Sequence, residues 1–181
     1  MVRTRVGYAG GTTEHPTYYN LGDHTETIQV EYDPTRISYQ ELLDVFWAGH
    51  DPARPAWSRQ YASIIFYHDE EQQRLARASK EQYATRGDRR VYTEIVPAAT
   101  FYLAEDYHQK YRLRLSPIFI DEFTAIYPEP ADLVNSTATA RVNGYLGGHG
   151  TLTDLQAEID DLGLSPNAQE ELLRIVLNRS N

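Results

Sequence analysis

The chain has 181 residues, of which 41% are hydrophobic and 24% are charged, and its formal net charge at pH 7 is −9. This composition is typical of a soluble globular protein with a real core. The net negative charge argues against a nucleic acid or an anionic membrane as a partner, because no basic stripe offsets it. The absence of cysteine excludes disulfides, thiolate metal sites and a cysteine nucleophile within these residues.

The sequence shows no membrane or export signal. No stretch approaches the roughly 18 apolar residues of a membrane span, and MVRTRVGYAGG at the N-terminus lacks a secretory hydrophobic region. None of the histidines has metal-ligand spacing, so we expect no bound metal. We therefore expect a cytoplasmic protein, taken as a monomer, with no membrane or nucleic-acid partner.

The first part of the chain alternates strand-like and helix-like segments. Strands are predicted over residues 2–8, 25–32, 61–67 and 91–96, with helices after Ser38 and over residues 69–83 and 104–115. Ser38 and Glu41 form a capping box, in which each side chain accepts a hydrogen bond from the other residue's backbone. This order predicts an α+β sandwich, with helices packed on one sheet.

The second part of the chain is predicted to be helical. Residues 117–131 are predicted as a connection containing prolines, and helices are predicted over residues 132–145, 153–162 and 166–178. Ser165 is expected to cap the last helix, with Pro166 at its first position. We therefore predict a first domain over residues 1–115 and a C-terminal helical extension over residues 116–181.

Glu26 interrupts the apolar face of the predicted strand 25–32. It shares strand parity with Ile28 and Val30, so its carboxylate is predicted to point to the core side. A carboxyl group on a core face is desolvated, which favours the neutral acid and makes it a proton donor for a substrate. The alternative is a glutamate at the first residue of the strand, where fraying leaves it exposed.

Three aromatic residues and one histidine are further candidates. Tyr8 ends its predicted strand and Tyr61 begins another, so each hydroxyl can donate to a substrate or be satisfied inside the core. Trp57 precedes Tyr61 in a loop with two prolines and would present an aromatic surface. His108 lies beside acids in AEDYHQKY and is either a site residue or a helix histidine with a local hydrogen bond.

Several motifs, in unbroken order over residues 2–115, resemble one family. VGYAGG, PTY, GDHTETIQVEYDP, ISYQELLDVFWAGHDP, RQYASIIFYHDEEQ and FYLAEDYHQKY are similar to the A-type peptide methionine sulfoxide reductases. The later STATARVNGYLGG is similar to the long C-terminal tail of a divergent branch of that family. The resemblance implies a ferredoxin-like sandwich and the reduction of methionine S-sulfoxide, free or in proteins, in repair after oxidation.

The resemblance also implies roles for the candidate residues. Glu26 matches the acid that protonates the sulfoxide oxygen, and Tyr8 and Tyr61 match the tyrosines that hydrogen-bond it. His108 matches a supporting polar residue, and Trp57 is expected to contribute to the substrate pocket. Thioredoxin or a similar dithiol is the implied reductant and partner, with no bound cofactor.

The chain departs from the family pattern at two places. The family nucleophile is the cysteine of a GCFWG motif upstream of VGYAGG, and the chain lacks this motif together with the family's first strand and helix. Ala56 stands where the family often has an aspartate, and Ala62 replaces the arginine after QY. The group that replaces this aspartate is not evident from the sequence.

Two hypotheses account for the missing cysteine, and a third concerns whether the chain folds well. In the first, translation starts upstream, Met1 is an internal residue, and the chain is a truncated form of the active reductase. In the second, the chain is a cysteine-less relative that binds methionine sulfoxide without turnover. In the third, it is a fragment that folds poorly. Under each of them we predict that the 181 residues alone are inactive, because no thiolate is available.

Overall fold

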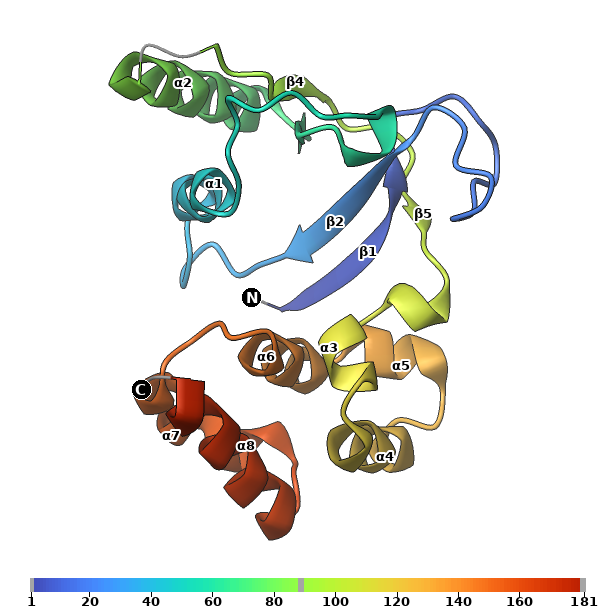
Figure 1. Cartoon of the computed structure of the whole chain (residues 1–181), viewed down its shortest axis with the longest axis vertical. Helices are drawn as coiled ribbons and strands as arrows, with labels where there is room; N and C mark the ends of the chain where they lie inside the picture. The colour runs from blue at the N-terminus through green and yellow to red at the C-terminus, as the bar shows by residue number, and fades with distance from the viewer. Residues whose placement is uncertain (1, 88–89, 180–181) are drawn as a thin grey trace. The chain divides into compact units, whose positions relative to one another are not determined.

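The structure is a computed structural model that describes residues 2–87 and 90–179 (Figure 1). Its strands and helices make it an α+β protein, as the sequence predicts. The chain divides into two compact units, one of Val6–Ala104 and one that joins the residues up to Arg5 with those from Glu105 onward. The predicted domain boundary after residue 115 stays a prediction, and Met1 lies outside the described residues.

The first unit contains most of a three-stranded sheet. Its order is β2 (Thr25–Glu31), β1 (Arg3–Ala9) and β5 (Tyr102–Leu103), and β1 pairs antiparallel with β5. Gly10 ends β1 with a φ of +79°, and a Cβ atom there would lie 2.9 Å from the Phe66 ring. Glycine is required at this turn because it accepts positive φ without steric cost.

A second, two-stranded sheet lies in the same unit. Strands β3 (Ile64–Tyr67) and β4 (Glu94–Pro97) pair in parallel, with Ile65 opposite Ile95. Helix α2 (Glu70–Gly87) supplies the long crossover that two parallel strands need. Helix α1 (Tyr39–Ala48) precedes them, and its predicted capping box of Ser38 and Glu41 is confirmed.

Helices α1 and α2 pack with β3 around one apolar cluster. Leu43, Trp47, Ile65 and Ala76 are its buried members. The Trp47 Nε1–H donates to Ser79 Oγ at 3.0 Å, and the Ser79 hydroxyl donates to the Ala76 carbonyl at 2.8 Å. The buried Trp47 N–H and Ser79 hydroxyl of this core are therefore satisfied, as burial requires.

The second unit is a group of short helices (Figure 1, yellow to red). They are η2 (Asp106–His108), α3 (Tyr111–Arg114), α4 (Pro117–Ile126), α5 (Pro130–Asn135), α6 (Thr137–Leu146), α7 (Leu152–Glu158), η3 (Ile159–Leu162) and α8 (Pro166–Arg179). Their core includes the fully buried Phe119, Phe123, Leu155 and Leu172. Within the described ranges, no helix combines the length and apolar character that crossing a bilayer requires.

The prediction of a connection over residues 117–131 is wrong, because this segment forms α4 and the start of α5. Pro117 and Pro130 mark the starts of these helices rather than breaks between them. In the first helical turn the N–H that proline lacks would have no intrahelical partner, so proline is tolerated there.

Two other predicted boundaries are also corrected. The helix expected over residues 104–115 is divided into η2 and the four-residue α3, and Lys110 between them has a φ of +51°. The strand expected from Tyr61 begins at Ile64, because Arg59–Tyr61 forms the 3-10 turn η1. Tyr61 therefore lies at the end of a turn and not at the start of a strand.

Candidate functional site

Glu26 lies near the start of β2, and its side chain is exposed. Ile28, two residues later on the same face, is 60% exposed, whereas Thr25 on the opposite face is 1% exposed. The predicted burial of Glu26 is therefore wrong: the face that carries it is open, and the other face packs inward. The Glu26 carboxylate can be reached by a ligand from solvent.

Gln60 holds the Glu26 carboxylate from the neighbouring turn η1. Its Nε2 donates a hydrogen bond to Glu26 Oε1 at 2.7 Å. The buried Thr25 hydroxyl lies 3.0 Å from the Gln60 carbonyl oxygen and 3.2 Å from that of Ala62. Since this hydroxyl has a single proton shared between two carbonyl oxygens, it ties η1 to β2 beside Glu26.

Tyr61 is surrounded by an acid and two other aromatic residues. Its ring stacks on Trp57 with centroids 4.8 Å apart, and its side chain hydrogen-bonds that of Tyr18. Partial burial raises the pKa of the Tyr61 phenol, with smaller contributions from the Glu26 carboxylate and Tyr18. The phenol therefore stays neutral near neutral pH and can donate a hydrogen bond. We call Glu26, Gln60, Tyr61, Trp57 and Tyr18 the acid–aromatic cluster.

The loop that carries Tyr18 is anchored at both ends by neighbouring polar residues. The Asp23 carboxylate accepts hydrogen bonds from the backbone N–H and hydroxyl groups of Thr12 and Thr13, which hold its pKa well below the usual range. The buried His24 ring accepts the Gly11 N–H at Nδ1 (3.2 Å) and donates from Nε2 to the Thr13 carbonyl (2.8 Å). These bonds close the loop and fix where it leaves β1.

The structure brings together three of the five predicted site residues: Glu26, Tyr61 and Trp57. Tyr8 is 2% exposed and packs in a core cluster with Leu21 and Ala104. His108 lies in the other compact unit, at the end of η2, with its ring 4.2 Å from that of Tyr107. The catalytic role of Tyr8 and the supporting role of His108 stay predictions.

Gln60 and Tyr18 are not among the site residues predicted from the sequence. Each lies inside a motif that carried the resemblance, since Gln60 directly precedes Tyr61 and Tyr18 ends PTY. For Gln60 the available signal was a polar side chain next to a predicted site residue, whereas Tyr18 has no predicted site residue beside it in the sequence. Their contacts with Glu26 and Tyr61 depend on η1 and on the closed loop, which local patterns do not predict.

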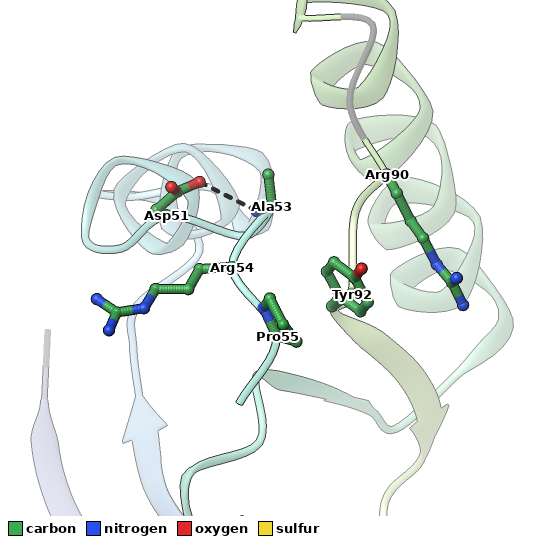
Figure 2. Close-up of a pocket in the computed structure, with 6 residues that line it drawn as sticks. All are labelled: Asp51, Ala53, Arg54, Pro55, Arg90 and Tyr92. Atoms are coloured by element: carbon green, nitrogen blue, oxygen red, sulfur yellow. Dashed lines mark hydrogen bonds between the residues drawn. The ribbon is translucent and has the colours of Figure 1, made fainter. Parts of the chain in front are cut away.

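A shallow hollow of about 440 Å³ lies close to the acid–aromatic cluster along the chain (Figure 2). Its lining residues are Asp51, Ala53, Arg54, Pro55, Arg90 and Tyr92. Over the described ranges, no three His, Asp or Glu side chains are arranged to hold a metal ion. At the acid–aromatic cluster, Glu26 and Tyr61 supply hydrogen-bonding groups and Trp57 supplies an aromatic surface.

Family comparisons agree with the resemblance. The sequence model described as peptide methionine sulfoxide reductase matches residues 1–124, and the helical domain of selenoprotein methionine sulfoxide reductase A matches residues 130–178. A crystal structure of Mxr1 from Saccharomyces cerevisiae in reduced form is similar, with a TM-score of 0.58 and 32% identity. That match covers 63% of this chain and 71% of that one.

Curated relatives extend the match into the helical unit. A peptide methionine sulfoxide reductase of Drosophila melanogaster is 44% identical over 94% of this chain and 69% of its own length. Peptide methionine sulfoxide reductase A5 of Oryza sativa is 42% identical over 90% of this chain, and that of Arabidopsis thaliana is 45% identical over 80%. The chain spans 66% and 59% of these two plant proteins. It belongs to the peptide methionine sulfoxide reductase family.

Proposed function

We propose that the protein reduces methionine S-sulfoxide, free or in proteins, to methionine in repair after oxidation. The observation that carries the proposal is the exposed Glu26 carboxylate, held by Gln60 at 2.7 Å and placed beside the Tyr61 phenol. Family membership supports the same assignment. We also propose that the protein is a cytoplasmic monomer that uses a thioredoxin-type dithiol.

The proposed reaction requires a thiol from outside these residues, because the 181-residue chain contains no cysteine. A thiolate attacks the sulfoxide sulfur while Glu26 supplies a proton to the departing oxygen. The thiol is oxidised to a sulfenic acid as the sulfoxide is reduced to methionine. The dithiol reductant then returns the sulfenic acid to a thiol and releases water.

Each of the described side chains has a separate role in binding the substrate. The Tyr61 hydroxyl donates to the sulfoxide oxygen, and Gln60 orients the Glu26 carboxylate by occupying one of its oxygens. Trp57, which is 82% exposed, offers its ring to the apolar part of the substrate side chain. Tyr8 and His108 are retained in the proposal on the family resemblance.

The absence of cysteine supports a second candidate function, in which the chain binds methionine sulfoxide without turning it over. With dithiothreitol and a methyl sulfoxide, we expect no reduction above that of a Glu26→Gln control. Reduction above this control would contradict the predicted inactivity. The intact mass and thiol content of the native protein show whether it carries an upstream cysteine nucleophile or contains no cysteine.

Calorimetry with a dipeptide that contains methionine S-sulfoxide tests both candidates. Glu26→Ala and Tyr61→Phe are each expected to weaken binding about three- to tenfold, because each removes one hydrogen-bonding group from the ligand. Glu170→Ala and Tyr111→Phe remove the same groups from exposed positions in the helical unit and should leave the affinity unchanged. Undetectable binding, or equal losses in the control variants, would rule out a sulfoxide site at this cluster.

A further inference from the structure

The hollow in Figure 2 takes no part in the proposed reaction, and we call it the arginine pocket. Pro55 and the ring of Tyr92 lie between Arg54 and Arg90, whose guanidinium groups point away from each other (Figure 2). The Tyr92 N–H donates to the Pro52 carbonyl at 2.9 Å, so a backbone hydrogen bond joins the two chain segments that line the pocket.

Arg54 and Arg90 are available to a ligand. Neither guanidinium has an ion-pair partner among residues 2–87 and 90–179, although Arg59 pairs with Glu94 at 2.6 Å in the same unit. Arg90 instead lies over the Tyr92 ring, 5.0 Å from its centroid. These positions form a locally basic surface on a chain whose net charge is −9.

The acid in the pocket, Asp51, is already engaged. Its Oδ1 accepts the Ala53 N–H at 3.1 Å, and its carbonyl accepts the Arg54 N–H at 3.1 Å (Figure 2). Asp51 therefore closes the turn that presents Arg54 rather than pairing with it. Asp51 keeps its negative charge, so the two arginines and the one aspartate that line the pocket sum to a charge of +1, and planar guanidinium groups suit a carboxylate.

The arginine pocket is close to the acid–aromatic cluster along one loop. Pro55 precedes Trp57 by two residues, so their Cα atoms are at most about 7 Å apart. The Trp57 ring in turn stacks 4.8 Å from the Tyr61 ring. An extended peptide advances about 3.3 Å per residue, so about two to four residues cover this path.

We infer that the arginine pocket binds an acidic side chain of a polypeptide substrate, about two to four positions from the oxidised methionine. This inference rests on the proposed function, because it assigns methionine sulfoxide to the acid–aromatic cluster. The acid stands before or after the methionine according to the direction in which the peptide lies across the cluster and the pocket. Free methionine sulfoxide has no such neighbour, so the pocket favours protein substrates with acidic flanks.

Calorimetry with matched nine-residue peptides tests the inference. Each peptide has a central methionine S-sulfoxide, with Asp, Asn or Lys three positions before or after it. The Asp peptides are expected to bind about three- to tenfold more tightly than the Asn peptides at low salt, and the advantage should shrink at high salt. The Lys peptides should bind more weakly than the Asn peptides, because the arginines repel them.

Arginine variants test whether Arg54 and Arg90 cause the stronger binding of the Asp peptides. In the double variant Arg54→Gln with Arg90→Gln, the Asp and Asn peptides should bind equally, with the Asn peptide at its wild-type affinity. Arg174→Gln removes one arginine charge on helix α8, where Arg174 pairs with Glu171, and should keep the Asp preference. Equal binding of Asp and Asn peptides to the wild type, or an Asp preference that survives the double variant, would overturn the inference.

The Asn peptides in oxidised and unoxidised form test the proposed function separately. A stronger affinity for the oxidised form supports the sulfoxide site, whatever the charge series shows. Equal affinity for the two forms contradicts the proposed function, and the arginine pocket is then no longer a flanking subsite. If no peptide binds at millimolar concentration, both proposals are wrong.

Discussion

At the scale of single residues, the turn η1 fixes the position of the Glu26 carboxylate through Gln60. The Gln60 amide donates to Oε1, which fixes the carboxylate and leaves Oε2 open to a ligand. The same turn places Tyr61 within electrostatic range of Glu26. The candidate site therefore depends on residues close in sequence to Tyr61 but remote in sequence from Glu26.

A second residue-scale feature is a shared carboxylate oxygen in the helical unit. Glu158 Oε1 accepts hydrogen bonds from Arg141 Nε at 2.8 Å, from Arg141 Nη2 at 2.6 Å and from the Tyr145 hydroxyl at 2.6 Å. Burial, followed by the hydrogen bond to Glu158, raises the pKa of Tyr145 to about 12. The neutral phenol is thus the form that the folded unit prefers.

This shift predicts a loss of stability at high pH. Because the folded pKa of Tyr145 lies above its unfolded value near 10, its contribution is complete below about pH 10 and is lost as the pH rises toward 12. The advantage of the wild type over Tyr145→Phe in unfolding free energy should fall by about 1–2 kcal/mol across this range, after allowance for solvent screening.

Urea unfolding at several pH values between about 8 and 12 measures this effect. Tyr111→Phe, at a 55% exposed position in the same unit, controls for the loss of a tyrosine hydroxyl. Parallel pH profiles for the wild type and Tyr145→Phe would show that Tyr145 does not titrate with unfolding.

At the scale of elements, Thr25 joins β2 to η1. Its hydroxyl is buried and lies within 3.2 Å of two carbonyl oxygens in and after that turn. Replacing this hydroxyl by a methyl group would leave the two carbonyl oxygens without this donor, while the side chain would keep its shape. This contact is what keeps Gln60 and Tyr61 beside Glu26.

Thr25→Val is therefore expected to lower the unfolding free energy by about 1–3 kcal/mol and to weaken binding of methionine sulfoxide. Thr25→Ser keeps the hydroxyl and should retain most of the affinity. Urea unfolding and calorimetry on the two variants give the comparison. If Thr25→Val bound as tightly as Thr25→Ser, the hydroxyl would have no part in placing the turn.

At the scale of the whole molecule, the helical unit has a core of its own. Leu155 on α7 is fully buried there with Phe119, Phe123 and Leu172. Leu155→Ala is expected to lower the unfolding free energy by about 2–5 kcal/mol, because it leaves a cavity among these side chains. Leu177→Ala, at a 46% exposed position on α8, should cost less than about 1 kcal/mol.

Thermal and urea unfolding compare these two leucine variants. Because the chain has two compact units, each transition should be followed by more than one probe before a single free energy is assigned. Similar losses for Leu155→Ala and Leu177→Ala would contradict a tightly packed helical core.

The sequence by itself determined several features of the structure. Period-2 patterning placed β1 and β2 within one residue of their observed ends, and Ser38 with Glu41 marked the start of α1. The motifs around Tyr8, Glu26 and Tyr61 identified the family, which the comparisons confirm. These features are local, because caps and strand periodicity depend on residues that are neighbours along the chain.

Only the tertiary structure decided which face of β2 is buried and which side chains meet Glu26. Strand parity assigned Glu26 correctly to the face of Ile28, but that face is exposed, because burial depends on what packs against a strand. Prolines that indicated a connection instead begin α4 and α5. The contact between Gln60 and Glu26 joins residues 34 positions apart, and no local pattern determines such a distance.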